Sequence, residues 1–313
     1  MADNSKKKGS ALEEDLIDLS DVTVDTPEED VTKEEDVKTS SSTTTNGSSQ
    51  KDEIAIGDRK APIIMLFGPR SSGKTMTLVR LARYLRDSHY TIEVDENFRA
   101  ESNYADKCSQ FLDDLDTNVA LSGTAYGDYL LVKIRKHGKT ICQILEAPGE
   151  HYFNPKNVTA TNFRPYMTKI IHKLPNRKIW VFITEARWKE DPKIKRAYIT
   201  RIENCKAALV QGRDRNVILY NKIDQKAFLF EDGKLHHVDA EEEMGNEYPG
   251  LQNIFVNKNP ITSLWRKYNY KFVPFCTGIY TQNEDDSDVL DYCESNDIYP
   301  AALWATLLKC IRG

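Results

Sequence analysis

One stretch of the sequence combines glycines, a lysine and a hydroxyl side chain at spacings that suit phosphate binding. Residues 68–75 read GPRSSGKT and fit the pattern G-x-x-x-x-G-K-[ST]. Glycines at both ends let the backbone wrap closely, so that successive N–H groups and the start of a following helix point at phosphate oxygens. Lys74 supplies a flexible positive charge, and the Thr75 hydroxyl is the expected ligand of Mg²⁺. The stretch therefore predicts a site for phosphate groups and Mg²⁺.

The sequence on both sides of this stretch supports the prediction. An apolar run, PIIMLF at 62–67, precedes it, and residues 73–87 follow with an apolar face of helical period. Strand, glycine-rich turn and helix in this order are the context that a P-loop requires, whereas a chance glycine-rich turn needs no such order. We expect the loop and the first helical turn to contribute these phosphate-binding residues: Gly68, Arg70, Ser71, Ser72, Gly73, Lys74, Thr75 and Met76.

A second segment, at the end of a later apolar strand, bears on which base is attached to the phosphates. Residues 217–224 read VILYNKID, and the last four resemble the N-K-x-D motif of P-loop GTPases of the Ras-like and translation-factor type. In that family the aspartate accepts two hydrogen bonds from guanine, which adenine cannot donate, and this charge-assisted bidentate contact selects the base. The resemblance implies that Asp224 reads guanine, Asn221 braces the P-loop and touches the base edge, and the Lys222 stem packs over the ring. The alternative interpretation is a helix N-cap at Asn221 or Asp224.

The same resemblance predicts a metal-binding segment and a further base-binding segment, and both are present in the expected order. Residues 146–149, EAPG, keep the spacing of the family's D-x-x-G motif, with the longer glutamate in place of aspartate. This resemblance implies that Glu146 holds Mg²⁺ and that the N–H of Gly149 meets the γ-phosphate. In PFCTG at 274–278, Cys276 and Thr277 occupy the place of the loop whose backbone meets the guanine oxygen.

The family also has a switch threonine that closes over Mg²⁺ and the γ-phosphate. Thr124, in LSGTAYGDYL at 121–130, stands at the matching place, and Thr117 is the fallback. The resemblance covers about residues 61–313, but two insertions, at about 88–120 and 226–258, distinguish this chain from compact small G proteins. The first insertion contains an expected extra strand and helix. The insertions and the N-terminal segment are where we expect contacts with protein partners that the sequence does not identify.

Hydrolysis of GTP needs a group that orients the attacking water, commonly Gln or His after the D-x-x-G glycine, and often an arginine. Glu150 follows Gly149 here, but a carboxylate adds like charge beside a triphosphate, and His151 is one position late. Arg70 and Arg99 are candidate arginines, with a plain surface charge as the alternative for each. We predict slow hydrolysis, with catalytic roles for these residues: Lys74, Thr124, Gly149, Glu150 and His151.

The sequence leaves three functions open. We predict a GTPase switch that binds GTP and GDP with Mg²⁺ and whose loops respond to the γ-phosphate. A GTP-binding assembly module with little hydrolysis is one alternative, suggested by Glu146 and the missing glutamine. An ATP-dependent P-loop protein or small-molecule kinase is the other; it would need a basic lid, such as residues 187–201, and would make Asp224 irrelevant to base choice.

These segments need a scaffold that brings their loops together. Apolar runs alternate with helix-length segments, and a four-residue turn, KHGK at 136–139, joins two of the runs as a hairpin. We predict a three-layer α/β P-loop fold, whose sheet is mostly parallel with one antiparallel hairpin. The predicted strands are 62–67, 128–135, 140–147, 178–184, 216–221 and 271–276. The predicted helices are 73–87, 102–115, 159–174, 192–211, 260–268 and 299–312.

Composition separates the N-terminal segment from the rest of the 313-residue chain. Residues 1–60 contain 16 Asp/Glu and 8 Lys/Arg, no aromatic residue, and a Ser/Thr-rich run at 39–50. Such a segment cannot repay the entropy of ordering, so we predict a disordered acidic tail before a single domain at 61–313. Within the tail, Leu12, Leu16 and Leu19 have helical spacing; a helix that docks on a partner and a transient structure without a role are both open.

Charge and cysteine content narrow the remaining classes of function. The chain carries a net −5 and the tail −8, so residues 61–313 carry +3, which argues against wholesale nucleic-acid binding. The basic stripe at 187–201 is interpreted as a solvated helix face. Six scattered cysteines without a C-x-x-C pair favour reduced thiols in a reducing compartment. No apolar run reaches membrane-spanning length, and no signal peptide is recognisable, so we expect a cytoplasmic protein.

Overall fold

The computed structural model describes residues 56–99, 103–117, 129–157, 163–188, 191–225, 230–231, 234–282 and 290–313. Almost all of the predicted tail, and Thr124 with it, lie outside the described residues, so those predictions stay predictions. Within the described part of the chain, none of the helices combines the length and the apolar character that crossing a membrane requires.

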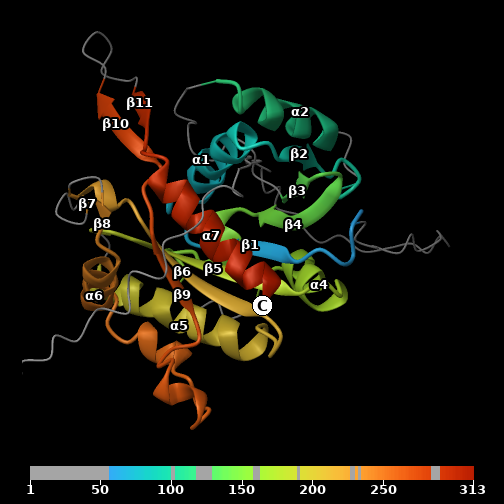
Figure 1. The fold of residues 1–313 in the computed structure, drawn as a ribbon. Coiled ribbons are helices and arrows are strands. Elements are labelled where there is room, and N and C mark those ends of the chain that lie inside the picture. Colours follow the sequence, from blue (N-terminus) through green and yellow to red (C-terminus); the bar gives the residue numbers. More distant parts are fainter. Residues whose placement is uncertain are drawn as a thin grey trace, which may run out of the picture.

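The fold is an α/β sandwich built on a seven-stranded, mostly parallel sheet in the order β2-β3-β4-β1-β5-β6-β9 (Figure 1). Strands β4, β1, β5, β6 and β9 run parallel to one another, and β2 and β3 pair antiparallel. This confirms the predicted fold class. The strands have these bounds: β1 Ile63–Phe67, β2 Thr91–Val94, β3 Leu130–Lys136, β4 Lys139–Glu146, β5 Lys178–Glu185, β6 Arg215–Asn221 and β9 Lys271–Pro274.

The hairpin predicted at 136–139 joins β3 to β4. His137 and Gly138 adopt φ values of 49° and 74°, the left-handed pair that a two-residue hairpin turn needs because it matches the twist of the strands. Two further antiparallel pairs were not predicted. These are β7 (Phe230–Glu231) with β8 (Lys234–Leu235), and β10 (Gly278–Gln282) with β11 (Leu290–Glu294).

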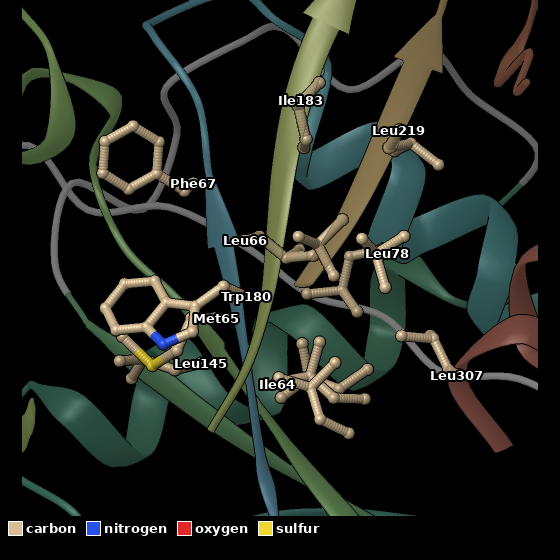
Figure 2. Packing of buried hydrophobic residues seen from close by; sticks show 14 of the residues in the cluster. Ile64, Met65, Leu66, Phe67, Leu78, Leu145, Trp180, Ile183, Leu219 and Leu307 are labelled. Atoms are coloured by element: carbon tan, nitrogen blue, oxygen red, sulfur yellow. The ribbon is translucent and has the colours of Figure 1, made fainter. Parts of the chain in front are cut away.

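Helices cover both faces of the sheet (Figure 1). Their bounds are α1 Lys74–Asp87, α2 Tyr104–Asp114, α3 Gly149–Tyr152, α4 Pro165–Lys173, α5 Pro192–Ala208, α6 His237–Glu247 and α7 Ile298–Arg312. Figure 2 shows Ile64 and Leu66 of β1 on the same side as Leu78 of α1 and Leu307 of α7. Phe67 packs on the opposite side, against Tyr198 of α5 with ring centroids 6.2 Å apart.

The core lies along the central strands because their side chains are apolar on both faces. Every residue of β1 and β5 is buried, as expected for parallel strands covered by helices on each side. Trp180 of β5 and Met65 of β1 are register partners and lie together on one face (Figure 2). Burial of this kind is worth about 1.5–3 kcal/mol for each large apolar side chain.

Two helix predictions differ from the structure. The helix predicted at 159–174 begins at Pro165, because the residue before a proline is driven to extended backbone and Arg164 has φ −56° and ψ 144°. The helix predicted at 260–268 is wrong, since only the short 3₁₀ turn η6 (Thr262–Leu264) forms there. Its apolar side chains have the spacing of a helix but no surface to pack against, and they stay exposed.

The topology gathers the candidate site at one edge of the sheet. Parallel strands present their carboxyl ends at a common edge, here called the carboxyl edge, and ligands of open α/β sheets bind there, at the point where the strand order reverses. The P-loop follows β1, the EAPG segment follows β4, and the NKID segment overlaps the end of β6 and the turn after it. The opposite edge, where the parallel strands begin, is called the amino edge.

Candidate functional site

The P-loop forms a tight turn between the end of β1 and the start of α1. Ser71 and Gly73 have φ values of 61° and 83°, and Gly73 is the N-cap residue of α1. Lys74, the first residue of α1, is only 6% exposed, and its Nζ donates a hydrogen bond of 3.0 Å to the carbonyl oxygen of Pro69. The ammonium group is therefore held over the loop, near the backbone N–H groups that follow, and this is an arrangement suited to an anion.

Thr75 and Glu146 meet beside the loop, although 71 residues separate them. The Thr75 hydroxyl donates to Glu146 Oε1 over 3.3 Å. Glu146 ends β4 and is 1% exposed. A hydroxyl and a buried carboxylate are both oxygen donors of the type that Mg²⁺ takes, so these two residues fit the metal that the sequence predicts. The longer side chain of glutamate, compared with aspartate, still reaches the hydroxyl.

Glycines at two positions allow the close packing of the site. A Cβ built on Gly149 would lie 2.3 Å from the backbone nitrogen of Arg70 and 2.6 Å from the carbonyl carbon of Pro69. A Cβ built on Gly68 would lie 2.6 Å from Ser72 Oγ. The segment after β4 thus lies against the P-loop backbone, with no space for a side chain at Gly149.

The end of β6 braces the P-loop from its other flank. Asn221 is buried, and its Nδ2 donates 2.9 Å to the carbonyl oxygen of Ser72. Lys222 has φ 61° and donates from Nζ to the carbonyl oxygen of Ser71 over 2.9 Å and to Glu185 Oε2. The Asn221 amide therefore bonds the backbone of the P-loop. The Lys222 ammonium is near the loop as well.

Asp224 and the segment after β9 come together at the far end of the candidate site. Asp224, in the 3₁₀ turn η3 (Ile223–Gln225), is exposed and accepts a hydrogen bond of 3.3 Å from Cys276 Sγ. Burial and the neighbouring Asp224 carboxylate raise the pKa of the Cys276 thiol, so it stays protonated and remains a donor. Thr277 is buried, and its carbonyl oxygen accepts from the Tyr292 hydroxyl over 2.9 Å.

The predicted catalytic side chains after Gly149 are already engaged. Arg70 and Glu150 form an ion pair of 3.1 Å between Nη1 and Oε1, so two candidates assigned to different tasks contact each other. His151 is half-buried against the Tyr129 ring, with ring centroids 5.2 Å apart. Burial, together with the positive charge of Arg164, lowers the pKa of His151 to about 4, so the imidazole is neutral at pH 7.

Two further candidates from the sequence, Arg99 and Thr117, contact other parts of the fold. The guanidinium of Arg99 stacks over the Tyr166 ring, 4.6 Å from its centroid, and it also lies over Tyr129. The carbonyl oxygen of Thr117 accepts a hydrogen bond from the side chain of Arg83. Arg83 lies nine residues after Lys74 in α1, which is about 13 Å from Lys74 along the helix axis. Thr117 is thus beside the body of the helix and not at the end that follows the P-loop.

Sequence reasoning missed Glu185, the last residue of β5. Its carboxylate pairs with Lys222 and it lines a groove of about 930 Å³ on the flank of the P-loop that faces α5. The groove is also lined by Arg70, Glu150 and Trp188. The signal was present in KIWVFITE, where a charged residue directly follows an apolar strand and must therefore lie at the carboxyl edge.

The basic stripe at 187–201 is only partly a solvated face. Lys193 and Arg196 of α5 are exposed, but Arg201 is buried, donates 2.7 Å to the carbonyl oxygen of Tyr152 and lies 3.8 Å from the Phe163 ring centroid. Arg201 therefore ties α5 to the last residue of α3. All six cysteines are free and only Cys293 is exposed, in agreement with the predicted thiols.

Comparisons with known proteins do not assign a family. No family model matches the chain, and no curated protein matches it. Among solved structures, the chain is similar to Roco2 RocCORdC from Methanosarcina barkeri, bound to GDP, with 12% identity and a TM-score of 0.29. The likeness covers 70% of this chain and 44% of that one, so this chain matches less than half of its neighbour's length. A TM-score of 0.29 is too low to transfer the neighbour's ligand to this chain.

Proposed function

We propose that this protein binds a guanine nucleotide with Mg²⁺ and acts as a GTPase switch that hydrolyses GTP slowly. The observation that supports this most is a hydrogen bond between the NKID segment and the P-loop. The Asn221 amide donates to the carbonyl oxygen of Ser72 over 2.9 Å. Asp224 follows three residues later, beside Cys276. One buried hydrogen bond thus ties the proposed phosphate cradle to the segment that carries Asp224, the proposed base-selecting carboxylate.

Each part of the nucleotide has a proposed partner. Lys74 and the P-loop N–H groups would take the β- and γ-phosphates, and Thr75 with Glu146 would hold Mg²⁺, which neutralises phosphate charge when it is bound. Gly149 would offer its N–H to the γ-phosphate. Asp224 would accept from the two N–H donors of guanine, and the backbone at Cys276 and Thr277 would meet the guanine oxygen. The role of Thr124 in this scheme remains a prediction of the sequence.

Slow hydrolysis is proposed from the state of the side chains next to Gly149. Water attack requires an acceptor that is positioned and available. Glu150 shares its carboxylate with Arg70 in an ion pair of 3.1 Å. His151 has a pKa lowered to about 4, because it is buried beside Arg164; the neutral imidazole accepts a proton poorly. Neither group is a strong general base in this arrangement.

The test is binding of fluorescent GDP and of a matching adenine nucleotide, with Mg²⁺, to the full chain and two variants. Lys74→Ala should weaken GDP binding about 100-fold, since charge-assisted hydrogen bonds are worth about 1.5–3 kcal/mol each. Asp224→Asn should weaken GDP about 10- to 100-fold and leave the adenine nucleotide unchanged. Lys206→Ala, a substitution at the amino edge, is the matched control and should change neither.

A change in the ligand isolates the contribution of Asp224. Inosine diphosphate lacks the exocyclic amine of guanine, so the wild-type chain should bind it about tenfold more weakly than GDP. In Asp224→Asn the difference between the two nucleotides should shrink, because the carboxylate that accepts from the exocyclic amine of guanine is gone. If inosine diphosphate binds more weakly than GDP by the same factor in the wild type and in Asp224→Asn, or if the chain prefers adenine, guanine recognition by Asp224 is contradicted. Multiple-turnover phosphate release then separates a slow GTPase from a module that only binds.

A further inference from the structure

A second pocket lies at the amino edge, at the end of the sheet opposite the P-loop. It has a volume of about 520 Å³ and lies between the end of α5, the starts of β6 and β9, and the end of α7. Its cationic lining is here called the basic rim, which consists of Lys206, Arg215, Arg266, Lys271 and Lys309. The lining contains a single carboxylate side chain, that of Asp214.

The cationic side chains of this pocket outnumber its carboxylate side chains. Asp214 faces inward and accepts from the backbone N–H of Lys178 over 3.0 Å and from the indole N–H of Trp180 over 3.2 Å. Among the described residues, Lys206, Arg266 and Lys271 form no ion pair with a carboxylate. These three cationic groups raise the local positive potential, which favours an anionic ligand.

An apolar projection adjoins the basic rim in the same loop. Ile261, Leu264 and Trp265, here called the apolar tip, are 73%, 81% and 88% exposed. They lie on and beside η6, in the orange loop that extends away from α5 in Figure 1. Trp265 directly precedes Arg266 of the rim. Large apolar side chains grouped on a surface and bordered by polar groups mark an interaction site.

The N-terminal segment enters the folded body at this same edge. The carbonyl oxygen of Asp58 accepts from Asn176 Nδ2 over 2.9 Å. Arg177, the next residue, donates to the carbonyl oxygen of Cys310 over 2.9 Å, and Cys310 lines the pocket. A continuous series of contacts therefore links the start of the described chain to the basic rim. From β1 to β9 there are three strand spacings, about 14 Å.

The sequence before residue 56 contains a stretch that matches this surface in both charge and apolar character. Residues 10–21, SALEEDLIDLSD, carry five carboxylates and no basic side chain. Leu12, Leu16 and Leu19 recur at helical spacing, and an isolated segment cannot bury them. Acidic and leucine side chains complement a basic rim and an apolar tip.

We propose that residues 10–21 dock on the basic rim and the apolar tip of the same molecule. The 34 residues between Asp21 and Ile56 are enough, because a flexible chain of this length spans about 30 Å on average. Linkage in one chain gives an effective concentration on the order of millimolar, so a weak contact is sufficient. An anionic membrane would also meet basic and apolar groups, but the matching segment and its exit at this edge favour the chain's own tail.

Trp265 supplies a direct readout in the full chain. Trp180 and Trp304 are fully buried and Trp188 is half-buried, so quenching by neutral acrylamide reports mainly on Trp265. The quenching constant, corrected with Trp265→Phe, should rise about threefold or more in Leu12→Ser/Leu16→Ser/Leu19→Ser if the tail covers this side chain. Urea unfolding of this variant is the control and should give the same free energy of unfolding as the wild type. The difference in quenching constant between the wild type and this variant should not depend on protein concentration, because the contact is within one molecule.

A charge exchange tests the pairing itself. Arg266→Glu/Lys271→Glu should expose Trp265 to acrylamide, and adding Glu13→Lys/Glu14→Lys/Asp15→Lys to that variant should protect it again. Lys193→Glu/Arg196→Glu, on exposed positions of α5, is the matched control and should have no effect. Unchanged quenching in the leucine variant, no rescue by the exchange, or concentration-dependent protection would overturn the proposal. Cosedimentation with phosphatidylserine vesicles that needs Trp265 but ignores the tail leucines would assign the surface to a membrane instead.

Discussion

The two edges of the central sheet arrange their polar side chains in opposite ways. At the carboxyl edge, the amide of Asn221 and the ammonium of Lys74 are turned back onto the P-loop backbone. At the amino edge, the basic rim surrounds an open pocket, and Trp265 projects into solvent. Both edges have a pocket, but at the carboxyl edge these polar groups bond the loop itself, whereas at the amino edge the rim side chains line the pocket.

The two ends of one strand show this difference most directly. Strand β6 reaches both edges, with Asn216 near its start and Asn221 at its end. The Asn216 amide bonds the carbonyl oxygen of Asn269 over 3.2 Å in an exposed setting, and the Asn221 amide bonds Ser72 over 2.9 Å in a buried one. Buried hydrogen bonds fix geometry because leaving them unmade is costly, while exposed ones exchange with water. The contact at the end of β6 is therefore expected to hold more firmly than the contact at its start.

Among the glycines and polar residues of the two edges, the largest expected effect comes from a glycine at the carboxyl edge. In Gly149→Ala the new methyl group would lie 2.3 Å from the backbone nitrogen of Arg70. Neither backbone can yield without moving the P-loop, so we expect a loss of about 2 kcal/mol in the free energy of unfolding and weaker GDP binding. Urea unfolding and nucleotide titration measure the two quantities.

A glycine at the amino edge is the matched control for that substitution. Gly212 lines the basic pocket, and a Cβ built there meets nothing within 4 Å. Gly212→Ala should be neutral or stabilise the fold by up to about 1 kcal/mol, because it restricts the unfolded chain. If Gly149→Ala were as well tolerated as Gly212→Ala, the contact between the EAPG segment and the P-loop would be looser than the structure indicates.

The two asparagines of β6 give a second matched pair. Asn221→Ala removes a buried hydrogen bond and leaves Ser72 O without that donor, so it should lower the free energy of unfolding by about 1–2 kcal/mol. Asn216→Ala should cost about 0.5 kcal/mol, since water replaces the exposed bond. Urea unfolding without nucleotide compares them. Equal losses would show that the P-loop brace contributes no more than a surface contact.

The pH dependence of stability distinguishes the edges as well. The pKa of His151 is lowered to about 4, so between pH 4 and 6.5 the unfolded state binds more protons and stability should rise with pH. Because His151 is only half-buried, we expect the free energy of unfolding to rise by about 1 kcal/mol over this range. Burial lowers the pKa of Lys178, at the amino edge, to about 8, so a second rise is expected between pH 8 and 10.5.

Substitutions identify the residue that causes each rise in stability. His151→Phe should remove the rise between pH 4 and 6.5 and leave the upper one, and Lys178→Met should do the reverse. Chemical denaturation at intervals of half a pH unit resolves both windows. A step that persists in the corresponding variant belongs to a different titrating group.

Much of the fold follows from the sequence, because long apolar runs report burial on both faces of a sheet. The runs at 62–67 and 178–184 lie within one residue of β1 and β5. The helix predicted at 260–268 failed for a related reason, since Ile261, Leu264 and Trp265 have helical spacing that serves a surface instead of a core. Periodicity reports which side chains share a face, but not whether the folded body offers a partner for that face.

The candidate site was predictable in its motifs but not in its contacts. Glycine and lysine spacing located the P-loop, and its strand-turn-helix context is present. The ion pair between Arg70 and Glu150 joins residues 80 positions apart, and no local pattern encodes it. Glu185 was missed because the predicted strand ended one residue too early. Residue types thus indicate the chemistry, while long-range packing decides which groups remain available for it.

The smallest expected effect tests whether the apolar tip serves recognition rather than stability. Trp265 is 88% exposed, so Trp265→Ala should change the free energy of unfolding by less than about 0.5 kcal/mol. Trp180, fully buried in β5, is the counterpart, and Trp180→Ala should cost about 3–5 kcal/mol. If the tail docks on Trp265, its removal should speed limited proteolysis of residues 1–55 while the folded body stays equally resistant. A large loss of stability in Trp265→Ala would instead make the tip part of the core, and the contrast between the two edges would no longer hold.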